Sequence, residues 1–354
     1  MKILIKNGRV WDGQRFFSAD VLTDGPVIEK IAPHLPEEGA WVFDAAGKTV
    51  CPGLVDAHVH MLVAPGEQYG FPTEMGAFPF GVTAVADAGR TRGETAVLDV
   101  LWLKHVLLVS VPIQENRPRL EVAEQALAHF GDRAIGLKVY FDTGVSEVTD
   151  ITPLQEICAF AKSRNLRVMV HCSGSPTPMA EILETLNPGD ILTHAFHGGR
   201  STAAEDGFES MQQAQRRGIV IDTGFAATVH TNFAVLRQAI QSGIVPDCIS
   251  TDITKFSAFT RGGRYGLTMA MSMARAAGME EEAVFRAVTA NPAAALGKTG
   301  QWGLLREGGP ADLAVLEECG EGFSLTDKVG NVLESALCWR CLLTVVDGQI
   351  VYKD

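Results

Sequence analysis

Basic residues are scarce in this sequence relative to acidic ones. The 354 residues include 30 lysines and arginines against 42 aspartates and glutamates, which gives a formal net charge of −12 at pH 7. Proteins that bind nucleic acid or anionic membrane surfaces usually carry basic patches and a positive balance. The charge therefore argues against a nucleic-acid partner and a membrane surface, and it favours a small-molecule substrate.

Long apolar runs are also missing. None of the apolar segments approaches the ~20 residues that a membrane-spanning helix requires. The first residues, MKILIKNGRVWDG, contain no apolar core followed by a small-residue cleavage site, so we expect no secretory leader. We therefore expect a cytoplasmic protein without a membrane partner, and the composition is compatible with a homo-oligomer.

A disulfide framework is a third absence. The seven cysteines are an odd number scattered along the chain, which favours reduced thiols. Cys338 and Cys341 have CxxC spacing, but a zinc site would need a second such pair, and the sequence has none. The surrounding ALCWRCLLTVV is typical of a strand, whereas a redox motif needs a helix after its first cysteine. We interpret these two cysteines as structural.

The sequence does contain a repeated alternation of short apolar runs and longer amphipathic segments. Segments such as 152–165 have helical periodicity, and Thr152 followed by Pro153 is typical of an N-cap and a first helical residue. This alternation predicts βα units in an α/β fold, and eight units predict a (β/α)8 TIM barrel over residues 51–299. The eight expected strands are 53–60, 82–89, 106–113, 134–141, 166–172, 190–196, 219–225 and 248–254.

The two ends of the chain have a different pattern, in which apolar and polar residues alternate. Asn7-Gly8, Asp24-Gly25 and Asp347-Gly348 are typical of tight turns between strands. Neither end alone has enough strands for a stable sheet. We therefore expect residues 1–50 and 300–354 to combine into one small β-sandwich domain beside the barrel.

Residues able to bind metal occur at the ends of the expected barrel strands. His58 and His60 are separated by one residue, so both side chains lie on one face of the first strand. The carboxyl ends of barrel strands meet at one mouth, where active sites are found. Four further strand ends supply Lys138, His171, His194 and Asp252.

Each of these six residues alone has an ordinary structural explanation, such as a hydrogen-bonded histidine, an ion-paired lysine or an aspartate that caps a helix. Their joint placement on five strand ends is much harder to explain without a shared role. Imidazole and carboxylate without thiolate suit zinc, or iron, manganese, cobalt or nickel. Four histidines and one aspartate exceed the needs of a single catalytic zinc, so we expect two divalent metal ions.

These motifs together resemble the amidohydrolase superfamily over essentially the whole chain. The resemblance lies in VDAHVH, GLKVY, MVHCS, THAFHG and ISTD, and in NPAAALG at 291–297 followed by GPADLAVLE. Within the superfamily, NPGDILTHAFHG and GIVPDCISTD most resemble the dihydroorotase-like deacetylases and amidohydrolases of the binuclear type.

The resemblance implies a role for each residue. His58 and His60, with Asp252, would hold the more buried metal ion, and His171 and His194 would hold the other. Lys138, carboxylated by CO₂, would bridge the two ions, with zinc as the expected metal. Asp252 would be the catalytic residue that takes the proton from the bridging hydroxide and passes it to the leaving group.

The sequence also departs from that branch. Phe225 and Ala226 stand where a His-Gly pair is usual, and His230 follows a few residues later. The Gly-rich loop after the eighth strand carries Arg261 and Arg264, which are either a clamp for a substrate anion or part of a solvated loop.

Two further residues are candidates for substrate contact. His197 lies close to the expected metal ligands without being one of them. Tyr140 lies two residues after Lys138, so its side chain is on the same side of the strand.

The leading function is hydrolysis of an amide, or an ester, in a small molecule that carries an anionic group, such as an N-acyl or N-acetyl amino acid. The alternatives are a cyclic-amide hydrolase of the dihydroorotase type or a deaminase, and then a non-catalytic scaffold. Lys138 counts against a deaminase, because the resemblance implies that deaminases more often use one metal without this lysine. A scaffold is disfavoured because every expected ligand position is filled.

Overall fold

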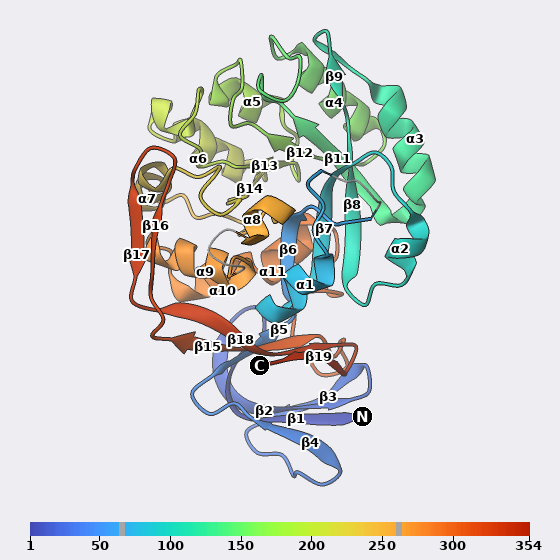
Figure 1. Cartoon of the computed structure of the whole chain (residues 1–354), viewed down its shortest axis with the longest axis vertical. Coiled ribbons are helices and arrows are strands. Elements are labelled where there is room, and N and C mark those ends of the chain that lie inside the picture. Colours follow the sequence, from blue (N-terminus) through green and yellow to red (C-terminus); the bar gives the residue numbers. More distant parts are fainter. Residues whose placement is uncertain (64–67, 260–263) are drawn as a thin grey trace.

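A curled parallel sheet forms the larger part of the protein (Figure 1). The computed structural model describes residues 1–63, 68–259 and 264–354. Seven strands follow one another in the order β14-β13-β12-β11-β8-β7-β6, and every neighbouring pair is parallel. Their bounds are β6 Leu54–Val59, β7 Val82–Arg90, β8 Lys104–Ser110, β11 Ala134–Tyr140, β12 Arg167–His171, β13 Ile191–Thr193 and β14 Val220–Ile221.

These strands are buried on both faces, which is why they are apolar with little alternation. Every residue of β6 is buried, and so are all but one of β12. The crossover helices between parallel strands pack against the sheet and cover its faces. The helices are α1 Thr73–Ala77, α2 Thr95–Asp99, α3 Leu120–Phe130, α4 Thr152–Ser163, α5 Met179–Thr185, α6 Glu209–Arg216, α7 Phe233–Gln241, α8 Lys255–Phe259, α9 Leu267–Ala276, α10 Glu281–Ala287 and α11 Ala290–Ala295.

The start of α4 differs slightly from expectation. Thr152 is the first helical residue rather than the N-cap, and Pro153 follows it within the first turn. The capping oxygen comes from Asp150, whose Oδ1 accepts a hydrogen bond from the Thr152 backbone N–H at 2.9 Å. The sequence therefore located the helix start, but the cap lies two residues earlier.

The eighth expected strand, 248–254, does not form a regular strand, and that expectation was wrong in detail. The segment makes only isolated parallel bridges, Asp222 with Cys248 and Val59 with Ile253. Side chains take the backbone donors that a ladder would use, since Thr251 N–H donates to Asp56 Oδ1 at 3.0 Å. The segment nevertheless contacts both edges of the sheet, because Asp252 N–H donates to the His58 carbonyl.

The second large sheet joins the two ends of the chain. Its eight strands run in the order β19-β18-β15-β5-β1-β2-β3, with β4 pairing to β1. The sheet curls, so that residues 26–28 beside β3 hydrogen-bond with residues 308–311 before β15. Its own core contains Ile3, Val21, Leu313 and Val345. The bounds are β1 Lys2–Trp11, β2 Phe16–Asp24, β3 Val27–Ala32, β4 Ala40–Asp44, β5 Thr49–Pro52, β15 Leu313–Cys319, β18 Cys338–Val346 and β19 Gln349–Lys353.

Two of the three expected turns are confirmed in this sheet. Asp24-Gly25 lies between β2 and β3, and Asp347-Gly348 joins β18 to β19 with positive φ at both residues. The expectation for Asn7-Gly8 was wrong, because β1 runs straight through it. The register of β1 against β2 shifts there, as in a β-bulge, and Asn7 has a φ of +60°.

A hairpin from the C-terminal region extends from the eight-stranded sheet and lies beside helices that cover the parallel sheet. β16 Phe323–Thr326 pairs with β17 Val332–Ser335, and Figure 1 shows this hairpin running along α7 and α9. Its turn is tied to the start of α7, because Phe233 N–H donates to Asp327 Oδ2 at 2.9 Å. Two further short strands, β9 Ile113–Gln114 and β10 Arg117–Pro118, pair with each other. None of the described helices is long and apolar enough to cross a membrane.

Candidate active site

A cavity of about 990 Å³ opens at the carboxyl ends of the parallel strands. Residues from the ends of β6, β11 and β12 line it, together with residues that follow β13 and β14 and with the turn between β16 and β17. Ligands of parallel α/β sheets bind at this end of the strands. Of the expected site residues, those that line the cavity are His58, His60, Tyr140, His171, His194, His197 and Asp252.

The two histidines of the first strand point to the same carboxylate oxygen. His58 Nε2 lies 3.3 Å and His60 Nε2 lies 2.9 Å from Asp252 Oδ1. This oxygen is buried, yet no hydrogen bond of acceptable geometry reaches it from any described residue. Two imidazole nitrogens and a carboxylate oxygen that converge in this way are arranged like ligands around one cation.

Hydrogen bonds on the Nδ1 side of the ring fix the orientation of His58. Its Nδ1 lies 3.0 Å from Thr193 Oγ1, and the Thr193 hydroxyl donates to Asp222 Oδ2 at 2.7 Å. Because this hydroxyl already donates to Asp222, it accepts from His58 Nδ1–H, so Nε2 is the unprotonated nitrogen and faces Lys138 Nζ and Asp252. Such outer hydrogen bonds commonly select the tautomer of metal-binding histidines. Asp222 also accepts from Ser250 Oγ at 2.8 Å.

Lys138 lies behind the same cluster and is completely buried. Its Nζ is 3.1 Å from His58 Nε2, and within the described ranges it forms no ion pair with a carboxylate. Burial lowers the pKa of Lys138 from 10.5 to about 8. A neutral amine is therefore accessible near neutral pH, and only a neutral amine can add CO₂.

Asp252 is held in an unusual backbone conformation, with a φ of +48°. Burial alone would raise the pKa of Asp252, but the neighbouring imidazoles of His58 and His60 hold it below its ordinary value. The carboxylate is therefore ionised at neutral pH and can accept a proton or bind a cation. Left-handed backbone in a residue other than glycine is often found at functional sites.

His171 and His194 form the other side of the cluster. Their ring centroids are 4.4 Å apart. His194 has a φ of +58°, and its Nδ1 lies 2.7 Å from the carbonyl oxygen of Gly224, so Nδ1 carries the proton and Nε2 is free. His171 Nε2 lies 3.3 Å from Asp142 Oδ2 and 2.8 Å from Ser173 Oγ. Burial lowers the pKa of both histidines, which keeps them neutral and able to bind metal.

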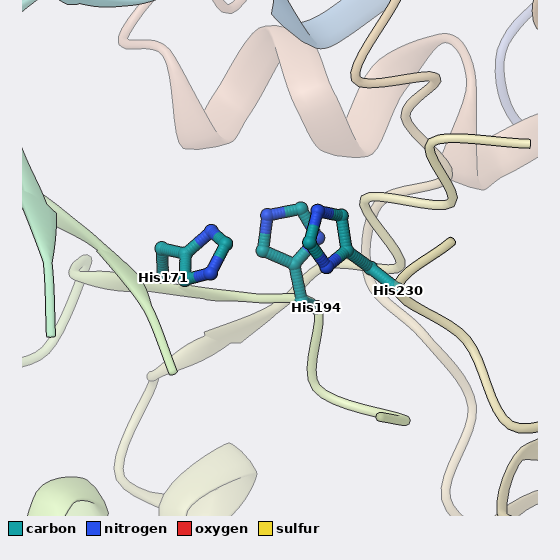
Figure 2. Close-up of side chains that lie close together, drawn as sticks. All are labelled: His171, His194 and His230. Carbon is teal, nitrogen blue, oxygen red and sulfur yellow. The ribbon is translucent and has the colours of Figure 1, made fainter. Parts of the chain in front are cut away.

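The sequence did not identify His230 as part of this cluster. Its ring centroid is 4.3 Å from that of His194 and 5.0 Å from that of His171, and Figure 2 shows the three rings together. Ligand atoms lie within 4.8 Å of one another in two groups, His171 with His194 and His230, and His58 with His194 and Asp252. The spacing TVHTN gave no signal, because His230 lies on an irregular segment.

The candidates for substrate contact have different outcomes. His197 Nδ1 accepts a hydrogen bond from Gly199 N–H at 3.1 Å, so the proton of the neutral ring is on Nε2. This Nε2 is buried and has no partner among the described residues. Tyr140 lines the cavity, and burial raises the pKa of its hydroxyl, which therefore stays protonated. Both residues can donate a hydrogen bond to a substrate oxygen.

The two arginines have different outcomes. Arg261 lies outside the described residues. Arg264 is exposed, its Nη1 lies 3.6 Å from Glu321 Oε2, and it is not among the residues that line the cavity. A role for either arginine in substrate binding stays a prediction. A cation that the sequence did not suggest, Lys328 on the turn between β16 and β17, does line the cavity.

Comparisons with known proteins show what the whole chain is similar to. The model of the amidohydrolase family matches residues 49–351. A deacetylase of Enterococcus faecalis is 29% identical over 370 residues, covering 98% of both chains. The crystal structure of a dihydroorotase has a TM-score of 0.87 and 24% identity, and covers 100% of this chain and 98% of that one. The crystal structure of an adenine deaminase has a TM-score of 0.87 and 26% identity, and covers 99% of both.

Proposed function

Because this chain belongs to the amidohydrolase family, and is therefore a metal-dependent hydrolase of carbon–nitrogen bonds, we propose that it cleaves the amide of a small N-acyl compound. N-acetyl and other N-acyl amino acids are the substrate class that we propose first. The observation that carries the proposal is the convergence of four imidazoles and Asp252 at the cavity, with Lys138 buried behind them 3.1 Å from His58 Nε2. The deacetylase similar over nearly its whole length supports an acyl group as the part that is removed.

The donor set supports two metal positions. We propose that His58, His60 and Asp252 hold one divalent ion, that His171 and His194 hold the second, and that a carboxylated Lys138 bridges them. Imidazole and carboxylate ligands without thiolate make zinc the expected metal. Two such ions would lower the pKa of a shared water and polarise the substrate carbonyl. The buried, unsatisfied Oδ1 of Asp252 supports the fit.

A carbamate at Lys138 would resolve an electrostatic conflict. An ammonium group here is completely buried, lies 3.1 Å from an imidazole nitrogen and has no carboxylate partner among the described residues. Burying an unpaired charge is strongly unfavourable. The ammonium first loses a proton, and addition of CO₂ to the neutral amine with loss of a second proton gives a carbamate. The cation is thus replaced by an anionic oxygen ligand, which bound metal ions would stabilise.

The chain's own groups can perform the proton transfers of amide hydrolysis. Asp252 is ionised at neutral pH, so it can take a proton from the attacking water and return it to the leaving amine. His197 Nε2–H can donate to the substrate oxygen on which negative charge develops. Tyr140 offers a second protonated donor on the same wall of the cavity.

An anionic group on the substrate is supported by the cavity mouth rather than by the expected arginines. Lys328 is exposed on the hairpin turn and lines the cavity. A carboxylate on the substrate could approach this ammonium while the amide lies over the histidines. This places recognition of the acid and hydrolysis of the amide on different parts of the chain.

Hydrolysis of a cyclic amide is the second candidate. The dihydroorotase structure covers this whole chain, although at 24% identity it supports the fold alone. A deaminase is supported by the adenine deaminase structure, but Lys138 at the metal cluster counts against it. Hydrolysis of an N-acyl compound and of a cyclic amide would use the same metal positions and differ in the bond that is cleaved.

We also propose the complete (β/α)8 barrel for residues 51–299 and a β-sandwich domain for residues 1–50 and 300–354. Contacts of segment 248–253 with both β14 and β6 support closure of the barrel. A break between the two parts near residue 53 is supported by the sheets, since β5 ends at Pro52 in the end sheet and β6 begins at Leu54 in the parallel sheet.

A substrate panel tests the proposed reaction. The metal-reconstituted protein would be assayed with N-acetyl and N-acyl derivatives of D- and L-amino acids, with dipeptides, with cyclic imides and with adenine. Release of carboxylate and free amine from an N-acyl amino acid, and its loss on chelation, is the expected result. Turnover restricted to cyclic imides or to adenine would contradict the proposed substrate class while leaving the metal site intact.

A further inference from the structure

His230 lies on a segment whose backbone is shaped to bring it over the other histidines. After β14, Ala226 and Ala227 have φ values of +45° and +60°, which non-glycine residues rarely adopt. Ala226 N–H donates to the Thr251 carbonyl at 2.9 Å, and Val229 N–H donates back to the Ala226 carbonyl at 3.1 Å. The chain therefore reverses direction at a fixed point just before His230.

The segment is also fixed on the other side of His230. Asn232 N–H donates to the Phe196 carbonyl at 3.0 Å, and the Asn232 side chain caps α7 by accepting from Ala234 N–H at 2.9 Å. Asn331 of the β16–β17 hairpin donates to the same side-chain oxygen at 3.0 Å. The chain is thus anchored to other segments on both sides of His230, at Ala226 and at Asn232, and this holds His230 near the cluster.

The geometry of the three rings suits one cation. Their ligand nitrogens lie within 4.8 Å of one another, and Figure 2 shows His171, His194 and His230 projecting from three different parts of the chain towards a common space. A zinc ion about 2.0–2.1 Å from each nitrogen needs nitrogens about 3.4 Å apart in a tetrahedral site. Small side-chain rotations would close that difference.

The hydrogen bonds of the three histidines leave a free nitrogen on each. His194 Nδ1 is engaged by the Gly224 carbonyl, and His171 Nε2 faces Asp142 and Ser173. Neither ring nitrogen of His230 has a hydrogen-bond partner in the described part of the chain, although Nε2 lies 3.9 Å from Asp252 Oδ2. His230 is mostly buried, with 23% of its side chain exposed. It is therefore not an ordinary surface histidine whose ring is hydrated on all sides.

We propose that His230 is a third imidazole ligand of the second metal position, and that His171, His194 and His230 bind a divalent cation independently of Lys138. The inference rests on the metal dependence of the proposed function, and it adds a ligand to that site. Three neutral ligands leave the full charge of the cation in place and require no CO₂. The ion held by His58, His60 and Asp252 would instead depend on the carboxylated lysine.

Metal titration of variants separates this role from substrate contact. Metal-free protein would be titrated with Zn²⁺ in competition with a chromophoric chelator, and with Co²⁺ while its visible absorption is recorded. The proteins are the wild type, His230→Ala, Lys138→Ala and the double variant, with circular dichroism to verify folding. His34→Ala is the matched control, because His34 is an exposed histidine between β3 and β4 and does not line the cavity.

The expected pattern is specific. Lys138→Ala should keep one tightly bound equivalent, and adding His230→Ala should weaken it. Removing a residue that only hydrogen-bonds to a metal ligand commonly lowers metal affinity about 10–100-fold. Removing a ligand itself should therefore lower metal affinity at least ~100-fold. The Co²⁺ absorption of Lys138→Ala should change when His230 is removed, and His34→Ala should bind like the wild type.

Two results would overturn the inference. If the double variant binds metal as tightly as Lys138→Ala does, with the same Co²⁺ spectrum, His230 is not a ligand, and the proposed function stands. If the wild type takes up no metal, the proposed metal dependence fails and the inference fails with it. The two failures are therefore distinguishable in one set of titrations.

Discussion

Replacing Lys138 with methionine should stabilise the metal-free protein at neutral pH while it abolishes turnover. Lys138 is completely buried, and no carboxylate of the described residues pairs with it. Methionine has a similar length and carries no charge. Hydrophobic replacement of a buried ionic group is often neutral or stabilising. The residue would thus be retained for its chemistry at a cost in stability.

The size of this gain in stability follows from the change in the pKa of Lys138 on folding. Burial lowers the pKa of Lys138 from 10.5 to about 8. Since one pKa unit corresponds to about 1.4 kcal/mol, the buried ammonium lowers the free energy of unfolding by about 3 kcal/mol below pH 8. Between pH 8 and pH 10.5 the unfolded chain binds a proton that the folded chain does not, so the stability of the wild type rises with pH in this window.

Urea unfolding of both metal-free proteins, followed by circular dichroism in CO₂-free buffer with a chelator, measures this difference. Lys138→Met should be more stable than the wild type at pH 7 by up to about 3 kcal/mol, and the advantage should shrink as the pH approaches 10. Lys162→Met is the matched control, because Lys162 is exposed on α4, and it should give no pH-dependent difference.

A stability difference that is the same at pH 7 and pH 10 would refute the reasoning, because the charge of Lys138 would then not be its source. Activity provides a separate check. Lys138→Ala should lose turnover and regain part of it when a short carboxylic acid fills the space of the carbamate. A variant that keeps the full rate without such an acid would end the carbamate hypothesis.

Three other variants test single steps. His197→Ala removes the proposed donor to the substrate oxygen. At unchanged metal content, kcat/KM should fall about 10–100-fold, as expected for the loss of a hydrogen bond of ~1.5–3 kcal/mol. An unchanged kcat/KM would exclude that contact. Asp222→Ala removes the acceptor that orients Thr193 and His58, and equilibrium dialysis should show metal affinity about 10–100-fold lower; equal affinity would mean that this relay has no role in binding. Lys328→Ala should raise KM for an N-acyl amino acid several-fold, and the effect should be smaller at high salt. KM for the corresponding N-acyl amide should stay unchanged. Equal effects on both substrates would contradict recognition of the substrate carboxylate by Lys328.

The sequence located the strand ends well, because a buried parallel strand has an unmistakable apolar pattern and its last residues point to one place. His58 and Lys138, 80 residues apart, were expected at the same mouth, and their side chains lie 3.1 Å apart. The helical periodicity of segment 152–165 is confirmed by α4, which spans Thr152–Ser163. Period and burial are properties of short segments, and these can be read directly from the sequence.

Features that depend on contacts between distant segments were missed. His230 reaches the cluster because two alanines adopt left-handed backbone and because Asn232 is tied to Phe196. Lys328 reaches the cavity because a hairpin of the C-terminal region packs on α7. Neither placement has a local signal in the sequence.

The errors in secondary structure have a similar cause. The segment 248–254 has the composition of a strand, but Asp56 takes the backbone donor of Thr251 that a ladder would use. Asn7-Gly8 has the composition of a turn, yet the pairing of β1 with β2 and β5 absorbs it as a bulge. In both cases a tertiary contact overrides a local preference.

The most direct test of the central claim is the metal content of the reconstituted protein measured together with its hydrolytic rate. Metal-free protein would be titrated with Zn²⁺ in the presence of bicarbonate, and bound metal would be determined by elemental analysis after gel filtration. We expect close to two equivalents per chain, with hydrolysis of an N-acyl amino acid reaching its maximum at the second. Full activity at one equivalent, or without metal, would contradict a hydrolase that uses two metal ions.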